Sequence, residues 1–466
     1  MLTHIAVGTH FRVIGVRGES DHLQTEGYDS DTYKTSCLLV TRGCLKRLLI
    51  ARGFSMTNST DAATELRSKR FATFWVGSLL SNIGTWMQQV AEPWLVLSLS
   101  ASPVLLGLDA FAMDAPVWLL TIMGGILADH GDRRRVIFFF QAIQMLCPLI
   151  LVGLILTGWI HVWMIIVLSF VVGVTDALSM PAFQSIVPSL VKPERIESAI
   201  ALNSTQFNLS RVLGPAFAGL VMAKYGAIGC FAANAFSYFP FLLVILWVLP
   251  KVKTRKRFDR KALGEGPWYS EIRSMSRDPI LRGALATTLV TSFFCGPLIA
   301  FVPVLVRDVF HSDVSHFGGA VSAFGLGGLL GAVAVLWIDG RIERRRLSSA
   351  SAIACAAMVI AAALTRSFSV LGVVLVLAGG VLTITNTSVN SILQAKARDQ
   401  IRGQTASLYM MAMRGGLSLG NLFMGVSIHF FGITHALIFN GIVAIVIHIW
   451  LYQSWANPAY VNLRRA

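Results

Sequence analysis

Stretches of about twenty mostly apolar residues recur along most of this chain, and they constrain its fold more than any other feature. A helix needs roughly 20 apolar residues to cross about 30 Å of hydrocarbon, and backbone groups in lipid must bond within their own segment. We count twelve such stretches: 71–98, 104–128, 136–157, 161–186, 198–223, 226–249, 283–306, 317–338, 347–365, 369–394, 404–428 and 433–455. The sequence therefore predicts an all-α integral membrane protein with twelve transmembrane helices.

The distribution of basic residues predicts how these helices are oriented. The even-numbered connections between the spans carry 22 Lys and Arg residues, whereas the odd-numbered ones carry only Lys224, Arg307 and Arg366. Positive charge concentrates on the cytoplasmic side of membrane proteins, so we expect both termini in the cytoplasm. The formal net charge of +15 is thereby explained without nucleic acid, and we expect the basic stretch 251–261 to lie against lipid headgroups.

The hydrophilic stretches divide the chain into five parts. Six spans (71–249) precede a linker at 250–282, and six more (283–455) follow it. Residues 1–70 lack any long apolar run, so we expect a disordered cytoplasmic extension, with Met56 as an alternative start and a basic surface helix at 37–54 as the other interpretation. Residues 456–466 are expected to form a cytoplasmic tail.

Signals of catalysis or of metal binding are missing from the sequence. The six cysteines have neither metal-binding nor redox spacing, and the histidines show no ligand spacing. No nucleophile-base pair and no nucleotide-binding loop occur in the hydrophilic parts. We therefore expect a protein that is not an enzyme and that needs no metal and no cofactor.

The two halves repeat a charge pattern between their second and third spans. In the first half Gly125 and Asp129 precede three arginines that include Arg133 and Arg134, and in the second half Asp339 precedes three arginines that begin with Arg344. The fifth span of each half also carries an Arg followed by small residues, in "SRVLGPAFAG" and "MRGGLSLGN". Internal duplication of six-helix units is typical of secondary transporters, whose substrate site lies between the repeats.

The chain from about residue 68 to residue 455 resembles the major facilitator superfamily. "GGILADHGDRRR" is similar to that family's G-x-x-x-D-[RK]-x-G-[RK]-[RK] loop, although His130 and Asp132 depart from it. The stretches 84–108 and 181–220 are similar to the bacterial exporters that include the enterobactin exporter. The resemblance implies two six-helix pseudo-symmetric bundles around a central cavity, and it implies a conformational-switch loop that contains Gly125, Asp129, Arg133, Arg134, Asp339 and Arg344.

"GPAFAG" in the fifth span resembles the antiporter motif G-P-x-x-G-G of the same family. Small residues at four-residue spacing let a partner helix approach closely, and a proline in a membrane helix permits a bend. The resemblance implies an antiporter-type packing surface formed by Ser210, Gly214, Pro215 and Gly219. Ordinary helix packing is the alternative interpretation.

Acidic residues inside the spans are candidates for proton coupling, because an ionisable group in the bilayer is costly and is usually functional. The candidates are Glu92, Asp109, Asp114 and Asp176. Spans three, six, nine and twelve contain no Asp, Glu, Lys or Arg, which agrees with the peripheral position that the resemblance implies for them.

Polar stripes on the first and tenth spans predict a substrate cavity. In the first span Asn82, Gln89 and Glu92 recur at helical spacing. The remaining cavity candidates are Gln206, Arg211, Asn386, Asn390 and Arg414. Arg211 remains charged even in apolar surroundings, so it either pairs with Asp176 or Asp109 or binds an anionic substrate.

These features together predict a secondary active transporter that exports a siderophore-like or drug-like amphipathic molecule in exchange for protons. The alternatives are a facilitator or uptake carrier for a small metabolite and, from another class, a membrane-embedded sensor or enzyme. We expect a multi-pass monomer in the bacterial inner membrane, with a small molecule, protons and lipid as its partners.

Overall fold

The computed structural model describes residues 69–130, 132–192, 195–249, 278–338, 342–396 and 402–456. All of them belong to one compact unit that begins at Thr60. The predicted extension with Met56, nearly all of the linker and the tail lie outside the described residues. The described residues form helices and contain no strand, which agrees with the all-helical prediction.

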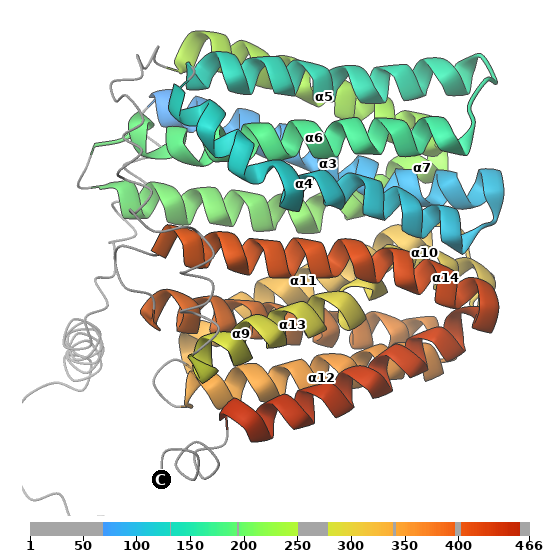
Figure 1. Cartoon of the computed structure of the whole chain (residues 1–466). Coiled ribbons are helices and arrows are strands. Elements are labelled where there is room, and N and C mark those ends of the chain that lie inside the picture. Colours follow the sequence, from blue (N-terminus) through green and yellow to red (C-terminus); the bar gives the residue numbers. More distant parts are fainter. Residues whose placement is uncertain are drawn as a thin grey trace, which may run out of the picture. The chain divides into compact units, whose positions relative to one another are not determined.

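The first helices correspond closely to the first six apolar stretches (Figure 1). They are α3 (Lys69–Ser100), α4 (Pro103–His130), α5 (Arg133–Leu156), α6 (Val162–Ile186), the short 3-10 turn η1 (Val187–Leu190) and α7 (Ile196–Val248). Asp132 caps α5 by accepting a hydrogen bond from the Arg134 backbone nitrogen, which satisfies one of the free donors of the first helical turn.

The remaining helices follow the linker (Figure 1). They are α9 (Pro279–Val290), the π-helical segment η4 (Thr291–Cys295), α10 (Pro297–Asp308), α11 (Val314–Ile338), α12 (Arg344–Leu364), α13 (Phe368–Lys396), α14 (Arg402–Leu451) and the π-helical segment η6 (Tyr452–Ala456). Asp278 caps α9 through a 2.8 Å hydrogen bond from the Ile280 nitrogen.

Two long helices reverse direction at a glycine. In α7 the break is at Gly226 (φ 65°, ψ −169°), and in α14 it is at Gly432 (φ 74°, ψ 161°). Only glycine adopts this combination of angles readily. Gly226 lies 30 residues after the start of α7, and Gly432 lies 30 residues after the start of α14. In both halves of the sequence, the last reversal of chain direction therefore lies at the same distance from the start of its helix.

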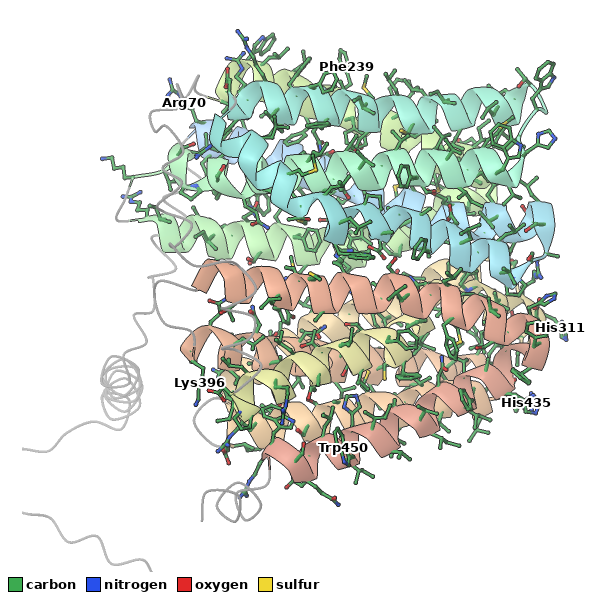
Figure 2. The ribbon with its side chains drawn as sticks, viewed as in Figure 1. Arg70, Phe239, His311, Lys396, His435 and Trp450 are labelled. Atoms are coloured by element: carbon green, nitrogen blue, oxygen red, sulfur yellow. The ribbon has the colours of Figure 1, made fainter. Side chains whose placement is uncertain are left out.

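Every residue with positive φ among the described ones lies in a short connection at one end of the helices. These residues are Ala101, Gly158, Gly226, His311 and Gly432, and we call this end the turn end. The opposite end, which carries Arg70 and Lys396, is the linker end. Figure 2 shows His311 and His435 at the turn end and Arg70 and Lys396 at the other.

Glycines bring the backbones of neighbouring helices into direct contact. A Cβ at Gly173 of α6 would lie 2.2 Å from the Met113 oxygen of α4. In the carboxy-terminal helices a Cβ at Gly327 of α11 would lie 1.9 Å from the Val376 oxygen of α13. Such small-residue contacts are typical of helix packing in membranes.

Large apolar side chains cover the outside of the helices. Trp247 is 81% exposed and Phe236 is 76% exposed, and Figure 2 shows Phe239 and Trp450 pointing outward. A soluble monomer rarely exposes so much apolar surface. Within the described residues nine helical segments are long and apolar enough to cross a membrane.

Candidate functional site

An ion pair joins the two halves of the sequence at the centre of the helices. Arg414 Nη1 of α14 lies 2.7 Å from Asp114 Oδ1 of α4. The Asp114 side chain is 15% exposed and the Arg414 side chain is 32% exposed, so the arginine also reaches open space. The sequence nominated Asp114 for proton coupling and Arg414 for the substrate cavity, and the structure brings the two together.

Arg211 of α7 lies between two aromatic rings instead of beside an acid. Its Cζ atom is 5.5 Å from the centre of the Trp86 ring of α3 and 5.7 Å from that of Phe324 of α11. Among the described residues it forms no ion pair. The predicted alternative, a pair with Asp176 or Asp109, is therefore wrong.

Donor groups without partners surround this region. Within the described residues, the Nε of Arg414, the indole nitrogen of Trp118 and the amide nitrogen of Gln206 are buried without a hydrogen-bond partner. Trp118 lies beside Arg414, because a Cβ at the neighbouring Gly415 would be 3.7 Å from the Trp118 ring. Buried polar groups are usually paired, so these donors are candidates for contact with a ligand.

Glu92 and Asp109 share a single hydroxyl group. Ser169 of α6 hydrogen-bonds Glu92 Oε1 of α3, and its Oγ lies 2.6 Å from Asp109 Oδ1 of α4. Gln88 Nε2 donates to the other Glu92 oxygen at 3.0 Å. Both acids are about 5% exposed. The solvated position considered as an alternative for Glu92 is therefore not found.

One series of hydrogen-bonded side chains, which we call the first polar chain, contains Gln88, Glu92, Asp109 and Ser169. Asp176 belongs to a second such series, the second polar chain. Gln144 Nε2 of α5 donates to Asp176 Oδ1 of α6 at 2.6 Å, and the Tyr238 hydroxyl of α7 donates to Gln144 Oε1 at 3.4 Å. The Tyr238 hydroxyl also lies 3.2 Å from the Thr85 hydroxyl of α3. Asp176 thus reaches α3 through uncharged side chains.

A small cavity separates the two polar chains. Its volume is about 20 Å³, which is enough for one water molecule. Its lining includes Glu92 and Gln88 from the first chain and Gln144, Tyr238 and Thr85 from the second. The two chains therefore face the same space.

Sequence reasoning missed five members of these polar chains: Gln88, Gln144, Ser169, Asn234 and Tyr238. Gln144 and Tyr238 lie in the third and sixth spans, which we expected to be peripheral because they carry no charge. Asn234 Nδ2 donates to Gln88 Oε1 at 2.6 Å, and the three amide residues are buried. A search for buried amides and hydroxyls in spans, in addition to charges, could have found them.

The remaining cavity candidates lie on α3, α7 and α13. Gln89 lines the small cavity, and Gln206 is buried and accepts a 3.5 Å hydrogen bond from Ser78. Asn82, Asn386 and Asn390 are half-buried, and the Oδ1 of Asn386 has no hydrogen-bond partner among the residues described. Their contact with a substrate stays a prediction.

The small residues of α7 pack against two different helices. A Cβ at Gly214 would lie 2.3 Å from the Trp86 Cβ of α3, and a Cβ at Gly318 of α11 would lie 2.8 Å from the Gly219 Cα and 2.9 Å from the Pro215 oxygen. Ser210 is buried and donates to the Gln206 carbonyl at 2.7 Å. This packing holds Trp86 and Phe324 close to Arg211.

The predicted switch loop is largely helical. Gly125 and the backbone of Asp129 lie in α4, whereas Asp339 lies outside the described residues. Arg133 donates to the Ser185 carbonyl of α6 at 3.4 Å, and Arg134 donates to the Leu246 carbonyl of α7. Cations stabilise the carboxy-terminal ends of helices. Arg344 is the first residue of α12.

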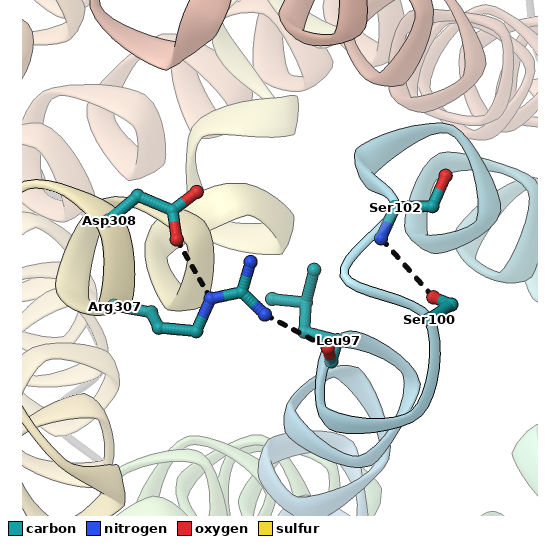
Figure 3. A network of polar contacts seen from close by, with 5 residues as sticks. All are labelled: Leu97, Ser100, Ser102, Arg307 and Asp308. Atoms are coloured by element: carbon teal, nitrogen blue, oxygen red, sulfur yellow. Dashed lines mark hydrogen bonds and ion pairs between the residues drawn. The ribbon is translucent and has the colours of Figure 1, made fainter.

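Arg307 connects the halves of the sequence at the turn end. Its Nη1 donates to the Leu97 carbonyl of α3 at 2.9 Å, and its Nε donates to Asp308 at 2.8 Å (Figure 3). Nearby, Trp94 of α3 stacks on Phe317 of α11 with ring centres 5.9 Å apart. A Cβ at Gly107 of α4 would lie 2.6 Å from the Asn421 oxygen of α14.

Comparison with known proteins identifies the family. The model of the transmembrane secretion effector family matches residues 60–459. A staphyloferrin A transporter of Staphylococcus aureus is 27% identical, over 81% of this chain and 94% of the relative. Macrolide efflux protein A of Streptococcus pyogenes is 22% identical, over 82% of this chain and 94% of the relative.

Solved structures show the same fold. An inward-facing, unoccupied bacterial homologue of the lysosomal transporter Spinster has a TM-score of 0.65 at 16% identity, and the match covers 83% of this chain and 96% of that chain. The relatives are transporters and not enzymes. The predicted resemblance is thus confirmed, and the chain is a multi-pass membrane transporter that belongs to the transmembrane secretion effector family of the major facilitator superfamily.

Proposed function

We propose that this protein exports an amphipathic small molecule in exchange for protons by alternating access. Relatives named for a siderophore and for macrolide efflux support export of siderophore-like or drug-like compounds. The observation that carries the proposal is the central Asp114–Arg414 pair, which joins α4 to α14 beside Arg211. Charged groups inside a membrane protein mark substrate and ion pathways.

The transporter would cross the membrane twelve times, as two six-helix bundles of residues 71–249 and 283–455. Nine described segments are apolar and long enough to span, and α3 adds a further helix of 32 residues. Two of the nine, Ser198–Val248 and Leu408–Trp455, are each long enough for two crossings and reverse at Gly226 and Gly432. The excess of Lys and Arg at the linker end supports cytoplasmic termini in a bacterial inner membrane. We propose a monomer, because one chain supplies both bundles.

Glu92 and Asp109 would carry the transported proton. A serine hydroxyl has one hydrogen to donate, yet Ser169 lies between oxygens of two carboxyl groups. Two buried carboxylates at this separation repel each other strongly. The Ser169 Oγ also lies 2.9 Å from the Ile165 carbonyl oxygen, so its one hydrogen serves at most one of three acceptors. At least one carboxyl group would therefore hold a proton and donate it to the Ser169 oxygen.

The proton would pass between this pair and Asp176 through the small cavity. A single water there would lie among Glu92, Tyr238 and Gln144. Tyr238 and Gln144 would then extend the path to Asp176. Asp176 interacts with the charges of Asp114 and Arg414. A change in the charge of Asp176 would therefore act on the ion pair that joins the bundles.

Alternating access would open the central polar site, which contains the four acids and Arg414, first to one side of the membrane and then to the other. Contacts at Arg307, Trp94 and Gly107 hold the helices together towards the turn end, which supports an outer side that is closed in this structure. If these contacts broke and others formed at the linker end, the central polar site would become exposed to the outside.

Transport in inverted membrane vesicles tests the function. Vesicles energised by respiration acidify their interior, and addition of an exchanged siderophore or drug should dissipate the pH gradient. We expect vesicles that contain Glu92→Gln or Asp109→Asn to lose this response. Asp313→Asn, an exposed acid near the turn end, is the matched control and should respond normally. Substrate movement that is unchanged after the pH gradient is collapsed would exclude proton coupling.

A further inference from the structure

We infer that the substrate carries a negative charge, of the carboxylate type, and that Arg211 binds it between the rings of Trp86 and Phe324. This inference deepens the proposed function and rests on it, because it assigns the sign of charge at the same central site. Relatives named for chemically different cargoes leave that sign open.

Arg211 is the positive group whose charge the protein leaves unbalanced. The described residues give its guanidinium no carboxylate partner, and its two aromatic neighbours come from α3 and α11. Arginine stacks on aromatic rings with its planar face while its edge remains able to bind a carboxylate with two hydrogen bonds. Arg414 is near enough to repel Arg211, so an anion between them would relieve that repulsion.

The acids of the site are already occupied by other partners. Asp114 pairs with Arg414, Asp176 accepts a hydrogen bond from Gln144, and Glu92 and Asp109 share Ser169. Each of these four acids has its own hydrogen-bond donor within the described residues, and none of them forms an ion pair with Arg211. Arg211 is therefore the group of the site that is available to bind an anion.

The unpartnered donors point to the same chemistry. The indole nitrogen of Trp118 and the Nε of Arg414 are buried without an acceptor in the part of the chain that the structure describes. Both groups can donate hydrogen bonds but cannot accept them. A ligand rich in acceptor oxygens would satisfy them. A carboxylate-bearing molecule with an apolar or aromatic body would fit both these donors and the rings beside Arg211.

Equilibrium binding to the purified full chain in lipid nanodiscs tests this sign of charge. The probes are dansylglutamate, dansylamide and dansylcadaverine, which share one fluorophore and carry negative, zero and positive charge. Energy transfer from tryptophan to the dansyl group reports binding. We expect dansylglutamate to bind at least about tenfold more tightly than the other two, because only its carboxylates can form charge-assisted hydrogen bonds with Arg211.

Variants then assign the preference to Arg211. Arg211→Gln should weaken dansylglutamate binding about tenfold or more and leave dansylcadaverine unchanged, whereas Arg211→Lys should retain most of the preference. Arg366→Gln, on the exposed connection before α13, is the matched control and should bind like the unmodified protein. Dansylcadaverine binding as tightly as dansylglutamate would overturn the inference, as would an Arg211→Gln protein with unchanged affinity.

The binding assay separates this inference from the proposed function. An anion preference that depends on Arg211, in a protein that does not move protons, would support the site and refute the coupling. Proton-driven export of compounds without a negative charge would support the coupling and refute the site.

Discussion

Arg414 and Asp114 lie 300 positions apart in the sequence, and the arginine Nη1 donates a 2.7 Å hydrogen bond to the aspartate. The bond crosses from α14 to α4, where the Ser418 hydroxyl also donates to the Phe111 carbonyl at 3.3 Å. A conformational change that separates these helices must break the ion pair or protonate Asp114. The ion pair can therefore couple protonation in the site to the packing of α4 against α14.

Stability measurements on charge-swapped variants test this pair. Asp114→Asn leaves Arg414 without its counter-charge and should destabilise the protein by about 1 to 3 kcal/mol. The double variant Asp114→Arg with Arg414→Asp should recover part of that loss. The midpoint of thermal unfolding in nanodiscs measures both, with Asp313→Asn as an exposed control. Equal melting of the single and the swapped variants would contradict a direct interaction.

The shared hydroxyl of Ser169 should govern proton-driven transport. Ser169→Ala removes the bridge between Glu92 and Asp109 and should slow efflux on the order of tenfold, whereas Ser169→Thr keeps the hydroxyl and should restore it. In the unmodified protein efflux should fall as the pH rises, because the shared proton is then lost. Ser427→Ala is the control, because the Ser427 hydroxyl donates to the Phe423 carbonyl of its own helix. A Ser169→Ala protein with the unmodified rate and pH profile would remove Ser169 from the path.

The reversal at Gly226 should depend on glycine. Gly226→Ala places a side chain at φ 65° and should cost about 1 to 3 kcal/mol. Gly153 lies within α5, where a new Cβ meets no atom within 4 Å, so Gly153→Ala should stabilise the helix by about 0.5 to 1 kcal/mol. Thermal unfolding of the two variants should therefore shift in opposite directions. Shifts of the same sign would show that backbone strain is not what selects glycine at Gly226.

The Arg307 contact should keep the turn end closed. Arg307→Gln removes the donor to the Leu97 carbonyl and should open this side more often. A cysteine introduced as Ala320→Cys, at a position of α11 that is 1% exposed, should then react several-fold faster with a membrane-impermeant maleimide. Arg366→Gln should leave the rate unchanged. Equal labelling in all three backgrounds would mean that Arg307 does not hold the turn end.

The sequence alone determined the helices and their connections. Apolar runs can satisfy their backbone only as helices in lipid, so the positions of α5, α6 and α12 follow from hydropathy to within a few residues. It also indicated a reversal between residues 223 and 226, where the structure bends at Gly226.

Tertiary structure decided which polar groups meet. Helical periodicity gives the spacing of residues along one face, but not which distant helix that face contacts, so the pairing of Asp114 with Arg414 and the isolation of Arg211 from acids could not be read from the spans. Gln144 and Tyr238 escaped detection because uncharged polar groups cost far less in an apolar helix than charges do. Their roles emerged only when packing placed them between Asp176 and Glu92, since a hydrogen bond needs its partner within about 3 Å in space and not in sequence.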